Sequence, residues 1–175
     1  MSTLSNYLSK YSFREQLLSD EIEEQLELVV VIPAHDENEL ITSVSSLQSC
    51  EAPQGAVEVI VVFNASEISF SEVILRNKQA KEGLMQWYEA LSNPIFKLHC
   101  IEENSLPKKH AGVGLARKIG MDEAVRRFDS VAKENGVIVC YDADSQCSRN
   151  YLVELEAHFI KHVKIGACSI HFEHP

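Results

Sequence analysis

The stretch Val137-Ile138-Val139-Cys140-Tyr141, followed directly by Asp142-Ala143-Asp144, is the most informative part of this chain. Apolar residues between Gly136 and an acidic turn are typical of a buried strand in a parallel sheet. Open α/β sheets bind ligands at the carboxyl ends of such strands. Two carboxylates there suit a hard divalent cation, and Mg²⁺ often bridges to substrate phosphates. The stretch therefore predicts a metal-assisted site for a phosphate-bearing substrate. The plainer interpretation is that both aspartates shape a loop and cap the next helix.

The composition predicts one soluble globular domain. The chain has 175 residues, of which 45% are apolar and 24% charged. No apolar run approaches the ~20 residues of a membrane span, and the N-terminus lacks a signal-peptide pattern. The formal net charge of −10 argues against a nucleic-acid binder, which would carry a basic footprint. Five cysteines, an odd number without Cys-x-x-Cys spacing, indicate reduced thiols in a cytoplasmic protein.

Strand and helix patterns alternate along the chain. Strands are expected over residues 26–32, 57–63, 95–101, 137–141 and 165–170, with Pro33 ending the first. Helices are expected over residues 39–49, from Ser69 or Ser71 to about 91, 111–133 and 150–162. This alternation predicts an α/β fold with a mostly parallel sheet and helices on both faces. Residues 1–26 form an expected helical extension outside the core, and residues 27–175 form the main domain. The last expected strand leaves the domain at the chain end, so we expect a truncated fold.

Polar segments follow four of the expected strands, at the edge of the sheet where ligands bind. They cover residues 33–38, 63–67, 108–117 and 142–145. Gly112 and Gly114 allow the backbone to approach a ligand, and a helix that starts there favours anions. The spacing is not the dinucleotide fingerprint G-x-G-x-x-G, because Arg117 holds the third place. Arg117 lies about one and a half turns into that helix, within reach of a diphosphate or an acidic loop.

Each segment also has a plainer interpretation. Asp36-Glu37-Asn38 can cap the first helix, Asn64 and Ser66 can be ordinary turn residues, and Lys108 and Lys109 can be solvated loop charges. The site interpretation is favoured because all four segments fall at the same edge of one expected sheet.

In their order and spacing, these segments resemble the nucleotide-binding half of family 2 glycosyltransferases of the GT-A fold. The likeness covers about residues 27–170 and rests on VVIPAHDEN at 30–38, VIVVFNAS at 59–66, GLARKIG at 114–120 and YDAD at 141–144. Any one of these motifs is common, so the specificity lies in the ordered set.

The resemblance implies roles for residues near the nucleoside. Pro33, Ala34 and Glu37 would line the nucleoside pocket. Asn64 would contact the base or the ribose, with Ser66 beside it. The family often has two acidic residues after the second strand, where this chain has Phe63-Asn64. Phe63 cannot hydrogen-bond a base, so this departure bears on base preference.

The resemblance also implies a diphosphate and metal site. Arg117 would help to hold the diphosphate, Asp142 would face the ribose or the donor sugar, and Asp144 would bind Mn²⁺ or Mg²⁺ with Asp142 as a second ligand. Three further positions complete the expected site: Lys109, Gly112 and Ala143. The family often has Arg-Asn where this chain has Arg117-Lys118. The family's catalytic base is expected beyond Pro175, so no residue is named for that role.

The leading hypothesis is metal-dependent transfer of a sugar from a UDP- or GDP-linked donor to a hydroxyl of a glycan, lipid or protein acceptor. A non-catalytic binding or scaffold protein of the same fold is the first alternative. A nucleotidyltransferase is the second, although it would want a Gly-rich loop where Pro33-Ala34-His35-Asp36 stands. We expect a cytoplasmic protein, held at the inner membrane face if a following segment anchors it.

Overall fold

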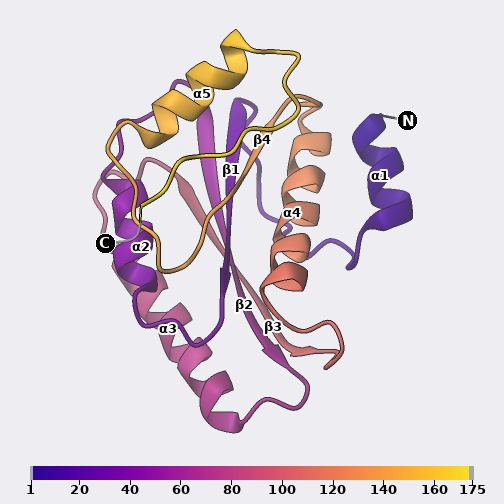
Figure 1. The fold of residues 1–175 in the computed structure, drawn as a ribbon, viewed down its shortest axis with the longest axis vertical. Coiled ribbons are helices and arrows are strands. Elements are labelled where there is room, and N and C mark those ends of the chain that lie inside the picture. The colour runs from indigo at the N-terminus through magenta and orange to yellow at the C-terminus, as the bar shows by residue number, and fades with distance from the viewer. Residues whose placement is uncertain (1, 174–175) are drawn as a thin grey trace.

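Four strands form one all-parallel sheet in the computed structural model, which describes residues 2–173 (Figure 1). They are β1 (Leu26–Ala34), β2 (Ala56–Ser66), β3 (Lys97–Leu106) and β4 (Val137–Cys140), in the order β3-β2-β1-β4 across the sheet. β1 lies inside the sheet, paired with β2 on one side and with β4 on the other. Each strand is joined to the next one in the chain by a connection that contains a helix and returns to the same end of the sheet. All four carboxyl ends therefore point the same way.

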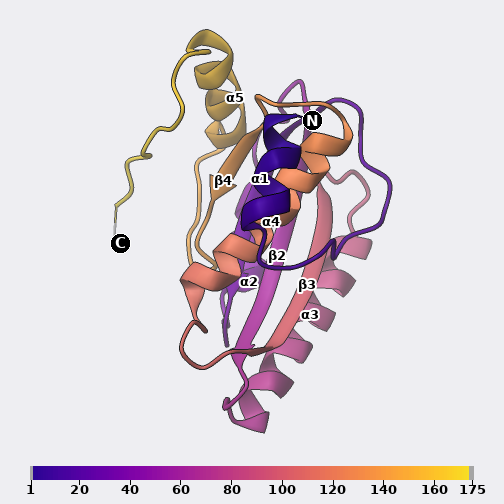
Figure 2. The same ribbon diagram turned by 90° about the vertical axis from the view of Figure 1, so that its right-hand side faces the viewer.

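Helices cover both faces of the sheet, as the sequence predicted (Figures 1 and 2). α2 (Leu40–Gln48), α3 (Ser71–Glu89) and α5 (Tyr151–Lys161) lie on one face, and α4 (Val113–Ser130) lies on the other. The division follows the alternation of side chains along a strand. In β1, Leu28, Val30 and Ile32 point into the first layer, whereas Val29 and Val31 point towards α4.

α4 lies very close to the sheet because it carries a glycine at the crossing point. A Cβ atom at Gly120 would come within 2.4 Å of Val31 Cγ1 and 3.1 Å of Val62 Cγ2. Only a residue without a side chain fits there, and the close approach buries Ile119 and Ala124 on either side. The sequence motif GLARKIG thus ends on a packing residue.

The N-terminal segment packs on the outer side of α4. Only α1 (Thr3–Tyr11) is helical, and the rest of the expected helical stretch runs as irregular chain to β1. Ser5 Oγ donates to Asp129 at 2.7 Å, and the Tyr7 hydroxyl donates to Asp122 at 2.9 Å. Both acceptors belong to α4, so side-chain hydrogen bonds fix this helix pair.

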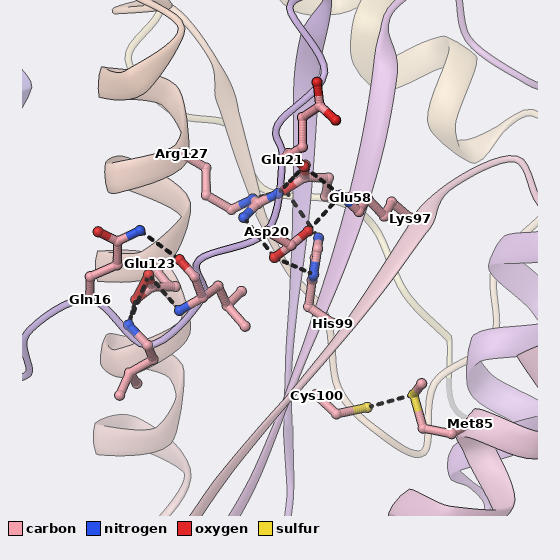
Figure 3. A network of polar contacts seen from close by, with 12 residues as sticks. Gln16, Asp20, Glu21, Glu58, Met85, Lys97, His99, Cys100, Glu123 and Arg127 are labelled. Atoms are coloured by element: carbon pink, nitrogen blue, oxygen red, sulfur yellow. Dashed lines mark hydrogen bonds and ion pairs between the residues drawn. The ribbon is translucent and has the colours of Figure 1, made fainter.

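A charged network ties the same N-terminal segment to the sheet (Figure 3). Arg127 of α4 forms an ion pair with Glu58 of β2, and the two side chains are 2% and 0% exposed. Asp20 joins them from the N-terminal segment, 3.3 Å from Arg127 and 2.5 Å from Lys97. His99 lies 3.5 Å from each of the two carboxylates. Burial of these charges is tolerated because each has a partner of opposite sign.

Two sequence expectations about strands were wrong. β1 runs through Pro33 to Ala34 rather than ending before the proline. The Val31 carbonyl accepts from Tyr141 N–H, so the backbone groups of Val31 point towards β4. Residues two apart in a strand direct their backbone groups to the same side, and next to Pro33 on that side β4 has already ended. Its missing N–H therefore leaves no gap in the ladder. The strand expected at 165–170 is absent from the described residues, since that stretch is exposed and pairs with no strand.

Other helix and strand boundaries also differ from those predicted. β2 and β3 extend to Ser66 and Leu106, several residues beyond the predicted ends. α3 begins after Phe70, which makes no side-chain cap; Ser69 instead accepts a hydrogen bond from Ser66 N–H. No helix among residues 2–173 has both the length and the apolar composition needed to cross a membrane.

Candidate functional site

A pocket of about 370 Å³ opens at the carboxyl edge of the sheet, among the loops that follow β1, β2 and β3. Its lining contains five of the predicted site residues: Pro33, Glu37, Asn64, Ser66 and Gly112. Sequence reasoning did not assign a role to four further lining residues: His35, Ser69, Ala111 and Val113. Ala34 is buried and does not line the pocket, but its carbonyl accepts from the side chain of Asn64, which does. The structure therefore brings together the residues for which a nucleoside role was expected.

The turn after β1 carries the acidic wall of this pocket. Asp36 has a φ of 58°, in the left-handed region that residues other than glycine seldom adopt. Its backbone N–H donates to Asn77 Oδ1 at 2.9 Å, and its carboxylate pairs with Arg76, with one contact of 2.7 Å. The alternative interpretation, in which Asp36-Glu37-Asn38 caps the first helix, is not what the structure shows, because α2 begins after Glu39 without a side-chain cap. The turn directs Glu37 into the pocket instead.

Glu37 is the half-buried carboxyl group of the pocket. Burial raises its pKa above the usual value, and the negative charge of Asp144 raises it further. His35 acts in the opposite direction. The influence of Asp144 means that the loops after β1 and β4 share one electrostatic environment, although they are far apart in the sequence.

Asn64 is a buried side chain at the end of β2. Its amide nitrogen donates to the Ala34 carbonyl at 3.0 Å, so the side chain bridges β1 and β2. Its backbone carbonyl accepts from Asn77 at 3.0 Å and lies 2.7 Å from His35 Nδ1. Because the amide nitrogen is bound to backbone, Oδ1 is the side-chain atom left to accept from a ligand.

Arg117 and Asp142 form an ion pair; neither lines the pocket, although Arg117 lies one helical turn beyond Val113, which does. Arg117 Nη2 donates to Asp142 Oδ1 at 2.5 Å, which joins the second turn of α4 to the loop after β4. Asp142 remains 61% exposed, whereas Arg117 Nε is buried and has no hydrogen-bond partner among the described residues. Arg117 therefore reaches one of the acidic loops, as its position in the sequence suggested.

The aspartates after β4 offer an open set of oxygen ligands. Asp142 and Asp144 are exposed, while Ala143 between them is buried and anchors the loop. Among residues 2–173, no group of three or more His, Cys, Asp or Glu side chains could hold a metal ion. Hard oxygen donors from two residues do suit Mg²⁺ or Mn²⁺ when water and substrate phosphates supply the other ligands. The residues fit an ion that is shared with a substrate, and do not fit a cage made by the protein alone.

The loop from β3 to α4 forms the other rim of the pocket. Gly112 has a φ of 141°, which favours glycine, and it precedes α4 without a side-chain cap. Space around Gly114 is open, because a Cβ atom there would meet nothing within 4 Å beyond its own turn of helix. Lys109 is exposed on this loop and does not line the pocket. Glu67 holds the loop in place by accepting from Lys108 N–H at 3.0 Å.

A larger hollow of about 600 Å³ lies elsewhere, between α5 and residues 168–170. None of the predicted site residues lines it. One of its walls is the exposed stretch that forms no strand. The smaller pocket is the better candidate site, because it lies where parallel sheets bind ligands and brings polar groups together from three loops.

The fold is that of an α/β protein of the GT-A type, with polar groups gathered at the carboxyl edge of the sheet. Solved structures of S. aureus TarS have a similar fold. TarS 1–349 matches with a TM-score of 0.51 and 17% identity over 79% of this chain and 33% of that chain. Its complexes with UDP-GlcNAc and with UDP match with TM-scores of 0.52 and 0.50, at 16% and 17% identity.

This likeness confirms the predicted fold class, at an identity that establishes the fold alone. The chain spans about a third of the length of the TarS 1–349 chains. No family model and no curated protein matches the sequence.

Proposed function

We propose that this chain binds the nucleoside diphosphate part of a nucleotide sugar and serves in transfer of that sugar to an acceptor hydroxyl. The observation that carries the proposal is the pocket formed by Pro33, Glu37, Asn64 and Gly112, together with the Arg117–Asp142 pair. The fold supports it, because similar structures of TarS were solved with UDP and with UDP-GlcNAc. The acceptor would be a glycan, a lipid or a protein.

In this proposal the base and ribose occupy the 370 Å³ pocket. Asn64 presents Oδ1 as an acceptor, which suits a base with a ring N–H, as in uracil or guanine. Glu37 and Ser66 also line the pocket and would accept from ribose hydroxyls. In this proposal the donor is UDP- or GDP-linked.

The diphosphate would lie towards the start of α4. Gly112 and Gly114 leave the backbone accessible there, and helix N-termini favour anions. Arg117 supplies positive charge, and Lys109 adds more from the exposed loop. Asp144, with Asp142, would hold Mn²⁺ or Mg²⁺. When bound, such an ion neutralises charge on a leaving diphosphate as a Lewis acid.

The test is calorimetric titration with UDP and with GDP, each with and without Mn²⁺. We expect micromolar binding of one nucleotide, strengthened by Mn²⁺. Asp144→Asn should remove the effect of Mn²⁺, and Glu82→Gln, an exposed carboxylate on α3, should leave it intact. If neither nucleotide binds, the proposal is wrong. Metal-independent binding would instead favour a protein that keeps the fold to bind a nucleotide without transfer.

A further inference from the structure

Asn77 is a polar side chain of α3 that is only 1% exposed and yet contacts three other segments. Its Oδ1 accepts from Asp36 N–H at 2.9 Å. Its Nδ2 donates to the Asn64 carbonyl at 3.0 Å and lies 3.4 Å from Asn104 Oδ1. Buried amides are almost always paired, and this one connects the ends of three strands.

These three contacts fall at the carboxyl ends of β1, β2 and β3. Asp36 follows β1, while Asn64 and Asn104 lie near the ends of β2 and β3. Asn77 itself is not among the residues that line the 370 Å³ pocket. It therefore lies behind the pocket, where it fixes the relative positions of the segments that form the wall.

The contact with Asp36 matters most, because that residue has a φ of 58°. Such a backbone conformation persists only where the surroundings hold it in place. The Asn77 acceptor is buried and bonds the backbone of the turn itself, whereas the bidentate Arg76 pair holds only the Asp36 side chain and is partly exposed to solvent. Loss of the Asn77 acceptor would leave a backbone N–H unpaired and free the turn that carries His35 and Glu37.

We propose that Asn77 is a positioning residue of the donor site. It holds the turn after β1 against the end of β2, so that Glu37 and Asn64 face the same nucleoside. An amide is required because one side chain must accept from Asp36 N–H and donate to the Asn64 carbonyl at once. This inference rests on the proposed function for its ligand, although its structural part can be measured without one.

Three variants separate positioning from general stability. Asn77→Ala removes both bonds. Asn77→Asp keeps the acceptor for Asp36 N–H but places a carboxylate against the Asn64 carbonyl. Lys78→Ala is the matched control, since Lys78 is the next residue of α3 and is exposed. In a double variant, Asn77→Ala with Asp36→Gly, position 36 carries a glycine, which adopts a positive φ without strain.

The experiment combines hydrogen exchange of the 34–38 segment with calorimetric titration of UDP and GDP. For Asn77→Ala we expect exchange in this segment to speed up at least tenfold and the nucleotide Kd to rise at least tenfold. Asn77→Asp should keep the exchange slow and show an intermediate Kd, and Lys78→Ala should match the wild type. The Asp36→Gly double variant should regain a good part of the affinity.

Two results would overturn the inference. One is unchanged exchange and unchanged affinity in Asn77→Ala. The other is exchange that speeds up equally across the whole chain while the Asp36→Gly variant regains nothing, since that pattern would mean a purely structural role. If Asn77→Ala does not fold, the test rests on Asn77→Asp, for which slow exchange with a raised Kd supports the inference and a Kd equal to that of the wild type overturns it. If the wild type binds neither nucleotide, the proposed function fails, while the exchange data still decide whether Asn77 holds the turn.

Discussion

Arg117 donates to Asp142 at 2.5 Å, and through this bond the start of α4 is joined to the loop after β4. The bond uses one nitrogen of a guanidinium group that has five N–H donors, and Nε is buried without a partner among residues 2–173. A diphosphate placed between the helix start and the acidic loop would meet the Nη donors of Arg117 that are not used by Asp142. Asp142 would then compete with phosphate for the same side chain.

Replacing Arg117 should therefore weaken diphosphate binding more than nucleoside binding. We expect Arg117→Lys to raise the Kd for the cognate nucleoside diphosphate roughly tenfold or more, because lysine keeps the charge but not the fork of donors. The Kd for the matching free nucleoside should stay the same, and titration of both ligands checks this. Equal losses for nucleoside and diphosphate would mean that Arg117 acts by holding the loop in place.

Glu37 should make the fold sensitive to pH. Burial and the Asp144 charge raise its pKa, so folding favours its neutral form. Its contribution to stability is complete below the unfolded-state pKa and is lost as pH rises through the raised folded-state pKa. Glu37→Gln should therefore raise Tm at pH 7 and lose that advantage at the acidic end of a pH series. The same variant should bind the nucleotide less tightly, since Glu37 lines the pocket.

Much of the pocket could be predicted because strand ends and loop residues adjoin in the sequence. Pro33, Glu37 and Asn64 each follow a strong apolar run, and parallel strands bring such positions to one edge. Asn77 could not be predicted, since a polar residue in the middle of α3 is usually solvated. Its burial depends on the way α3 crosses the sheet, which local patterns do not encode.

The charged network of the N-terminal segment could not be predicted from the sequence either. The acidic stretch around Asp20 gave no indication that it would meet Arg127, 107 residues away, beside a buried Glu58. The failed strand at 165–170 is the converse case. Its apolar residues suit a strand, but a strand also requires a neighbour, and none is available among the described residues.

The Glu58–Arg127 pair should be costly to break. Burial alone would raise the pKa of Glu58, but the adjacent His99 and the hydrogen bonds and charge of Arg127 outweigh it and lower that pKa. Arg127→Met leaves a buried carboxylate without its main partner, and we expect a loss of about 3–5 kcal/mol in urea unfolding. The double variant Glu58→Met with Arg127→Met should recover most of that loss. An unstable double variant would mean that the ion pair itself stabilises the fold.

The wild-type pair also predicts acid sensitivity. Since the folded-state pKa of Glu58 is lowered, its contribution to stability is present above the unfolded-state pKa and is lost as pH falls through the folded-state value. The double variant should lack this contribution. Unfolding curves of both proteins between neutral and acidic pH would reveal the difference.

Gly120 and Gly114 of α4 allow two effects of an added methyl group to be compared, namely a clash within the core and a block at the proposed ligand site. Alanine favours helix interiors over glycine by up to ~1 kcal/mol, so either Gly→Ala change would be helpful if space allowed. Gly120→Ala places a methyl group 2.4 Å from Val31 Cγ1, and we expect a loss of about 1–3 kcal/mol. The methyl group of Gly114→Ala meets no other part of the chain within 4 Å, so the free protein should unfold at equal or higher urea concentration.

For nucleotide affinity we expect the opposite order to that for stability: Gly114→Ala should be the more damaging of the two variants. Gly114 lies in the first turn of α4, where a bound diphosphate would approach the backbone, and a methyl group there would hold the phosphates away. We expect Gly114→Ala to raise the nucleotide Kd while Gly120→Ala, measured below its unfolding temperature, leaves it near the wild-type value. If Gly114→Ala binds as tightly as the wild type, the diphosphate does not lie at the helix start, and Arg117 is the main group that binds it.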